Sequence, residues 1–202
     1  LNLAELGLGS VFTFELYEPL HAKDNATVCA YVVLFKKIYY VIIAAICCIG
    51  MALIPFLGDI THSTLPTNYL VMYYLLYLVD SLASYFAVYR TTVIEADQKR
   101  YVVQYIEVAT KLIQYVLQSI YLLRHHDFEG YLIIQVFFTI LRNVLLHWIA
   151  GKMYPYLRNK EVLRIEQKTM KKIAINVKAT FISRLSDTVM NQTDSIIISA
   201  LI

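Results

Sequence analysis

Seven ionisable side chains lie inside stretches of the sequence that are otherwise apolar. The basic ones are Lys111, Arg142 and Arg184, and the acidic ones are Asp80, Glu107, Asp187 and Asp194. An ionised group near the middle of a bilayer costs about 2.5–3.5 kcal/mol, so seven of them facing lipid would cost on the order of 20 kcal/mol. We therefore expect these charges to face one another or a hydrated cavity, as in proteins that move a polar solute.

The apolar stretches that carry these charges have the length of membrane-spanning helices. They are Ile38–Leu57, Tyr69–Tyr89, Tyr101–Leu123, Tyr131–Ala150 and Thr180–Ile202. A helix needs about 20 residues to cross ~30 Å of hydrocarbon. The composition agrees, because 58% of the residues are hydrophobic and only 16% are charged, whereas soluble domains carry about 25% charged residues. The sequence therefore predicts an all-α, polytopic membrane helix bundle.

The distribution of Lys and Arg predicts the topology. Segment 18–37 holds three, 90–100 three and 151–178 eight, whereas 124–130 holds one and 58–68 none. Because cytoplasmic connections are enriched in basic residues, the first three segments are predicted to be cytoplasmic. The net charge of +3 then reflects membrane topology, so no nucleic-acid partner is expected.

Polar side chains gather within a narrow arc of four predicted helices, at about 100° per residue. By helix they are Gln104, Glu107, Lys111, Gln114 and Gln118; Tyr73, Tyr77, Asp80 and Ser84; Gln135, Thr139, Arg142 and Asn143; and Arg184, Asp187, Asn191, Asp194 and Ser195. Glu107 and Lys111 are spaced to pair on one face. The four polar faces predict one central hydrated cleft. The alternative is a dry bundle held by interhelical hydrogen bonds and ion pairs.

Such a cleft suits a substrate that carries phosphate and sugar rings. The expected phosphate-binding cations are Lys111, Arg142 and Arg184. The expected partners of hydroxyl groups are Gln104, Gln114, Gln118, Gln135, Asn143 and Asn191, with Tyr73 and Tyr77 stacking on rings. The acids Asp80, Glu107, Asp187 and Asp194 would balance charge or couple H⁺ or Na⁺. No Gly-rich phosphate loop, nucleophile elbow or paired zinc ligands appear, so neither a cofactor, a metal nor enzyme chemistry is expected.

Several short motifs resemble those of one transporter family. They are Gly7-Leu-Gly-Ser-Val-Phe-Thr-Phe-Glu-Leu-Tyr-Glu-Pro-Leu20, Lys36-Lys-Ile-Tyr-Tyr, Ala96-Asp-Gln-Lys99, Lys152-Met-Tyr-Pro-Tyr-Leu157 and Asn191-Gln-Thr-Asp-Ser-Ile-Ile-Ile-Ser199. In this order they resemble the bacterial oligosaccharide flippases, or polysaccharide transport proteins, of the multidrug/oligosaccharidyl-lipid/polysaccharide exporter superfamily.

The resemblance implies a protein of twelve to fourteen spans, with two six-helix lobes around a cavity of alternating access. Its substrate would be an undecaprenyl-pyrophosphate-linked oligosaccharide in the bacterial plasma membrane, with polysaccharide polymerase and glycosyltransferase partners. The chain would be an internal fragment covering spans two to seven, inactive alone. Residues 1–150 would form spans two to six, 151–178 a cytoplasmic basic amphipathic interlobe linker, and 179–202 the first span of the second lobe.

Three alternatives stay open at the level of sequence. A drug/cation antiporter of the same superfamily would favour a cavity rich in acids and aromatics with few cations. A polyprenyl-dependent membrane glycosyltransferase would need a large outer loop, and 58–68 and 124–130 are short. A scaffold without transport activity would pair its charges in a dry core.

Overall fold

The computed structural model describes residues 8–58, 66–125, 127–158, 165, 167, 169–180, 182–183 and 186. Within these residues the chain is all-α, as predicted, and contains no strand. The chain divides into two compact units, one of residues 1–31 with 159–202 and one of residues 32–158. We describe each unit separately.

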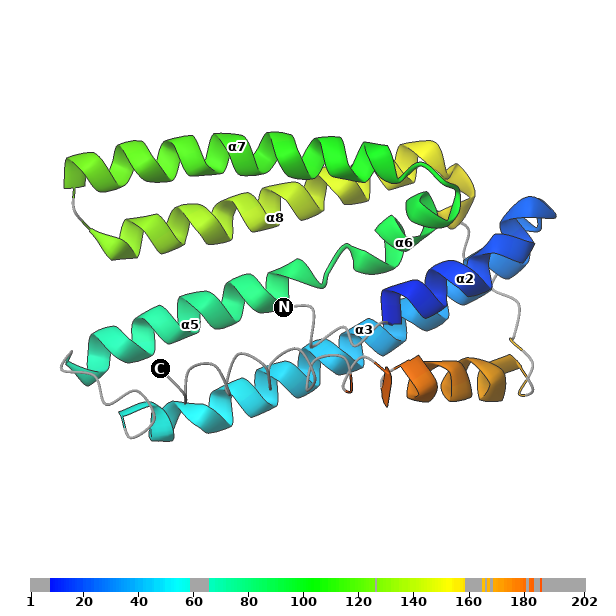
Figure 1. The fold of residues 1–202 in the computed structure, drawn as a ribbon, viewed down its shortest axis with the longest axis horizontal. Helices are drawn as coiled ribbons and strands as arrows, with labels where there is room; N and C mark the ends of the chain where they lie inside the picture. The colour runs from blue at the N-terminus through cyan, green and yellow to red at the C-terminus, as the bar shows by residue number, and fades with distance from the viewer. Residues whose placement is uncertain are drawn as a thin grey trace, which may run out of the picture. The chain divides into compact units, whose positions relative to one another are not determined.

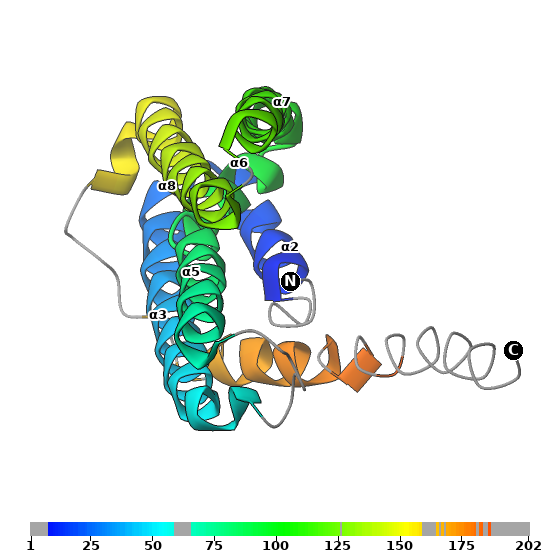
Figure 2. The same ribbon diagram turned by 90° about the vertical axis from the view of Figure 1, so that its left-hand side faces the viewer.

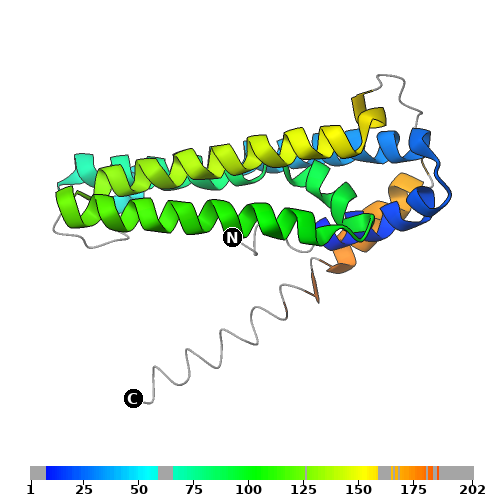
Figure 3. The ribbon, with the colours of Figure 1, turned by 90° about the horizontal axis from the view of Figure 1, so that it is seen from above.

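The larger unit is built around one central helix. Its elements are α3 (Asn25–Leu53, from Val32 onward), η1 (Ile54–Phe56), α5 (Thr67–Ser84), α6 (Val88–Ala96), α7 (Arg100–His125), α8 (Phe128–Met153) and η2 (Pro155–Arg158). Helix α8 packs against α5, α6 and α7 (Figure 1), and an end view shows it between α5 and α7 (Figure 2). Helices α7 and α8 run side by side as a long hairpin (Figure 3). Phe35, Tyr85, Ile94 and Leu132 are buried in this unit.

Among the residues that the structure describes, three helical segments are long and apolar enough to cross a membrane: Asn25–Phe56, Thr67–Ala96 and Phe128–Met153. Between 11% and 28% of the residues in their most apolar windows are buried, so most apolar side chains point outward, as lipid-facing residues do. Both findings support the expectation of a membrane protein. Helix α7 has 26 residues, about 39 Å at 1.5 Å per residue. It is not among the three because its polar stripe lowers its mean hydropathy, so its role as a span stays a prediction.

The second of these segments is interrupted. The sequence predicts one span over Tyr69–Tyr89, but α5 ends at Ser84 and α6 begins at Val88. The backbone N–H of Tyr85 donates to Leu82 O (3.2 Å) and that of Phe86 to Ala83 O (3.2 Å), the tighter pattern of a 3₁₀ turn. The side-chain amide of Asn143 on α8 also donates to Ala83 O. A side chain that bonds into the helical ladder is one recognised cause of such a kink.

The predicted connections are shorter in the structure than in the sequence analysis. Helix α3 already begins at Asn25, inside the predicted connection 18–37, and α6 runs to Ala96, inside 90–100. The difference arises because helices continue beyond the apolar core of a span, and hydropathy marks only that core. What separates α6 from α7 is a turn at 97–99. There Gln98 has a φ of 58°, the left-handed conformation of a Schellman C-cap.

The turn between α7 and α8 is fixed by Asp127. Its carboxylate accepts the N–H groups of Glu129 (3.0 Å) and Gly130 (3.2 Å), which caps the N-terminus of α8. These two backbone donors lower the pKa of Asp127 below its ordinary value. Tyr121 of α7 donates its hydroxyl to the same carboxylate (3.2 Å). Its ring lies so close to Gly130 that a Cβ there would overlap it, so glycine allows the two helices to approach.

The smaller unit contains α2 (Leu8–His21), the first residues of α3, and a helical stretch at 169–180. Glu15 of α2 is buried, and its carboxylate accepts from Lys172 Nζ (3.4 Å) and Asn176 Nδ2 (3.0 Å). The basic segment 151–178 thus supplies the partners of an acid on α2. The sequence analysis did not assign a role to Glu15.

Candidate functional site

Polar side chains from three helices meet along α8. Gln135 Nε2 donates to Asp80 Oδ2 of α5 (2.7 Å), and Gln118 Nε2 of α7 donates to the backbone carbonyl of Tyr131 (3.0 Å). Asn143 donates to Ala83 O at the helix interruption. We call Asp80, Gln118, Gln135 and Asn143 the α8 seam. All four come from the predicted polar stripes. Asp80 and Gln135 bond each other through their side chains, whereas Gln118 and Asn143 bond backbone carbonyls of a neighbouring helix.

Asp80 is the charged member of the seam. Its Oδ2 accepts from Gln135, whereas its Oδ1 is buried and has no hydrogen-bond partner within the described residues. Buried carboxylate oxygens are normally paired, because leaving one unpaired costs the desolvation of a charged group. The free oxygen is therefore available to a further partner, such as a cation or water.

The polar stripe of α7 divides into a packed part and an exposed part. Gln118 is 2% exposed, and Gln114 Nε2 lies 3.4 Å from Gln118 Oε1. Gln104 and Lys111 are exposed, although they lie within the same predicted arc of the helix as the buried Gln118. The predicted pairing of Glu107 with Lys111 is not formed in the described structure.

The remaining predicted site residues are only partly brought together. Arg142 is half-buried and forms no ion pair with the described acids. Tyr73 packs edge-on against the ring of Phe128, with ring centroids 5.3 Å apart, whereas Tyr77 is 45% exposed. Residues outside the described part of the chain are Arg184, Asp187, Asn191 and Asp194.

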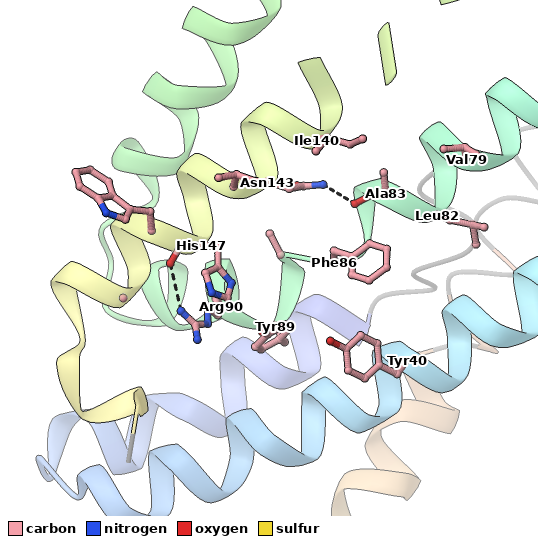
Figure 4. Close-up of a pocket in the computed structure, with 14 residues that line it drawn as sticks. Tyr40, Val79, Leu82, Ala83, Phe86, Tyr89, Arg90, Ile140, Asn143 and His147 are labelled. Carbon is pink, nitrogen blue, oxygen red and sulfur yellow. Dashed lines mark hydrogen bonds between the residues drawn. The ribbon is translucent and has the colours of Figure 1, made fainter. Parts of the chain in front are cut away.

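A cavity of about 790 Å³ opens beside the helix interruption, bounded by α3, α5, α6 and α8 (Figure 4). Most of its wall is apolar, with side chains such as Val79, Leu82, Phe86 and Ile140. Asn143 is the one predicted site residue among the fourteen that line it. Arg90 at the start of α6 donates from Nη1 to the carbonyl of His147 on α8 (3.2 Å) (Figure 4).

Sequence reasoning missed this cavity. It placed Arg90 in a connection between spans, interpreted Tyr40 as an aromatic residue near a span end, and gave no role to His147 or Trp148. The interruption that creates the cavity contains neither Gly nor Pro, since its sequence is Tyr85-Phe86-Ala87. Nothing local therefore predicts it. One signal was present: aromatic residues flank the basic positions at the inner ends of the predicted spans.

The end of the larger unit that holds the turn at 97–99 is fixed by a cluster around Asp97. Its carboxylate accepts from Tyr154 Oη (2.8 Å) and pairs with Lys99 Nζ (2.7 Å). Burial opposes ionisation of Asp97, but the bonds from Lys99 and Tyr154 outweigh it and lower its pKa. Burial and the nearby Asp97 carboxylate raise the pKa of Tyr154 well above its ordinary value. The cluster joins two of the motifs quoted in the sequence analysis, the one at 96–99 and the one at 152–157.

The described residues contain no group of three or more His, Cys, Asp or Glu side chains able to hold a metal ion. Comparison of the chain with protein-family models gave no match. The comparisons with curated proteins and with solved structures likewise gave no match. The resemblance to flippases therefore rests on the sequence motifs.

Proposed function

We propose that the chain is part of a membrane transporter that moves a lipid-linked oligosaccharide across the bacterial plasma membrane by alternating access. The α8 seam is the observation that supports this most, because it places an acid and three amide side chains along α8, among membrane-length helices. Amides and carboxylates are also the groups that bond sugar hydroxyls in binding sites.

In this proposal the exposed polar edge of α7 and the half-buried Arg142 face the transported molecule. Lys111 and Arg142 would contact the pyrophosphate or acidic sugars, because ammonium and guanidinium groups hold phosphate oxygens well. Gln104 and Gln114 would bond hydroxyl groups. The substrate would be an undecaprenyl-pyrophosphate-linked precursor of O-antigen, capsule or teichoic acid, working beside a polymerase and glycosyltransferases.

The test replaces Arg142 in the chromosomal gene. We expect Arg142→Ala to reduce surface polysaccharide at least tenfold and to accumulate its polyprenyl-linked precursor inside the cell, since a charge-assisted contact is worth about 1.5–3 kcal/mol. Arg142→Lys should retain part of the activity. Ile133→Ala is the matched control, because Ile133 lies on the same helix, is 56% exposed and is not on the polar face. Normal polysaccharide in Arg142→Ala, at normal protein level, would exclude the role.

One observation favours a second candidate, a drug/cation antiporter of the same superfamily. The free Oδ1 of Asp80 is suited to bind a proton or a monovalent cation within the bundle. The two candidates differ in their response to Asp80→Asn. In an antiporter this change abolishes cation-coupled drug efflux, and the level of surface polysaccharide does not change.

A further inference from the structure

The cavity beside the helix interruption is chemically two-sided. Towards α5 its wall consists of Val79, Leu82, Phe86 and Ile140. At the other end lies Arg90, the only charged side chain among the fourteen described residues that line it. Arg90 bonds a backbone carbonyl and is in no ion pair within the described residues. A guanidinium in a largely apolar pocket without a carboxylate needs an anion or water as its partner.

Two further cations lie beside the same end. Lys36 Nζ lies 5.5 Å from the ring centre of Tyr40 and 5.8 Å from that of Tyr89, and both rings line the cavity. Lys152 Nζ lies 4.2 Å from the ring centre of Trp148, a third lining residue. Aromatic faces hold cations without neutralising them. The mouth of the cavity is therefore positive.

The predicted spans put these cations at the depth expected for lipid phosphate groups. Lys36 lies just before the predicted span Ile38–Leu57, Arg90 just after Tyr69–Tyr89, and Lys152 just after Tyr131–Ala150. All three belong to segments predicted to be cytoplasmic. Tyr40, Tyr89 and Trp148 stand at the same level, as aromatic residues do at a membrane interface. The apolar part of the cavity continues from there toward the membrane centre along α5.

We propose that this cavity binds one anionic phospholipid of the inner leaflet. The phosphate of its head group contacts Arg90, with Lys36 and Lys152 adding attraction, and one acyl chain lies against Leu82, Phe86 and Ile140. A zwitterionic lipid supplies the same chain but no net charge, and inorganic phosphate supplies the charge but no chain. Only an anionic lipid matches both halves. The site does not depend on the proposed transport of oligosaccharide.

The chain carries its own reporter of occupancy, because Trp148 is its single tryptophan and lines the cavity. The chain is reconstituted into lipid nanodiscs that contain a small fraction of phosphatidylglycerol or phosphatidylcholine with brominated acyl chains. Bromine quenches indole fluorescence only over short distances. The apparent affinity of each lipid follows from quenching as a function of its fraction.

We expect brominated phosphatidylglycerol to quench at least fivefold more effectively than brominated phosphatidylcholine. A basic residue near an anionic surface contributes about a fivefold preference, so Arg90→Gln should remove about that factor and Arg90→Lys should keep most of it. Arg100→Ala is the control for general surface charge, since Arg100 is also basic but is highly exposed, 3.9 Å from Glu95. Retained helicity by circular dichroism and unchanged unquenched fluorescence show that each variant is folded.

Three results would overturn the proposal. Equal quenching by the two brominated lipids would show that the mouth does not select charge. Equal losses in Arg90→Gln and Arg100→Ala would attribute the preference to the surface as a whole. Recovery of fluorescence on addition of inorganic phosphate would identify a site for soluble phosphate and not for a lipid.

Discussion

The hydrogen bond from Asn143 to Ala83 O joins α8 to the helix interruption and gives the sharpest stability prediction. Asn143 is 8% exposed, so its amide has little access to solvent. Hydrogen bonds between helices of membrane proteins contribute about 0.6 kcal/mol on average and up to about 1.7 kcal/mol. The carbonyl of Ala83 also accepts the N–H of Phe86 (3.2 Å), so it keeps one hydrogen bond when the Asn143 side chain is removed. We therefore expect Asn143→Ala to lower the free energy of unfolding by about 1–2 kcal/mol, lost packing included.

The measurement is unfolding of the reconstituted chain by increasing fractions of SDS, followed by circular dichroism. Val144→Ala is the matched control, because Val144 adjoins Asn143 and lines the same cavity but is 59% exposed. It should cost less than about 0.5 kcal/mol. Amide exchange at Tyr85–Ala87 should accelerate about tenfold in Asn143→Ala if about 1.4 kcal/mol is lost locally. Equal stability of the two variants with unchanged exchange would refute the role given to Asn143.

Two further predictions follow from α7 and from the Asp97 cluster. In a chain with its cysteines replaced, Lys111→Cys should react with an impermeant aqueous thiol reagent and Ile113→Cys should not, although Ile113 is 55% exposed. The proposal places Lys111 toward water and Ile113 toward lipid, so equal reactivity would contradict a hydrated face on α7. Tyr154→Phe should lower the free energy of unfolding by about 1 kcal/mol at pH 7. Because the folded-state pKa of Asp97 lies below the ordinary carboxyl value of 3.8, its contribution is present above pH 3.8 and is lost as the pH falls through the folded-state pKa. The difference in unfolding free energy between Tyr154→Phe and the unchanged chain should therefore shrink below about pH 3.8. SDS unfolding titrations at several pH values measure it, and a difference that does not change with pH would show that Tyr154 does not act through the ionised carboxylate of Asp97.

Hydropathy and helical periodicity predicted much of the architecture correctly. They predicted the all-α class and the helices around Ile38, Tyr69, Tyr101 and Tyr131, because length in lipid and a period of 3.6 residues are both local properties. Spacing also placed Gln118 and Gln135 on the faces that contact neighbouring helices.

The remaining features depend on contacts between residues distant in sequence. The interruption at Tyr85–Ala87 involves Asn143, and no local breaker precedes it. The cavity combines Tyr40, Arg90 and His147 from three helices, so no single segment reveals it. Periodicity also could not show that Lys111 would be exposed while Gln118 was buried, because both lie within one predicted arc.

The interruption also changes how the second membrane segment can fit a bilayer. An unbroken helix over the 30 residues of Thr67–Ala96 would measure about 45 Å, well beyond ~30 Å of hydrocarbon. A rigid helix of that length has to tilt or extend beyond the hydrocarbon. Each ångström of mismatch between helix and bilayer costs a fraction of a kcal/mol. With two shorter rods joined at Tyr85–Ala87, a change of membrane thickness is absorbed by bending at the joint. Helix α8 can then keep its own tilt.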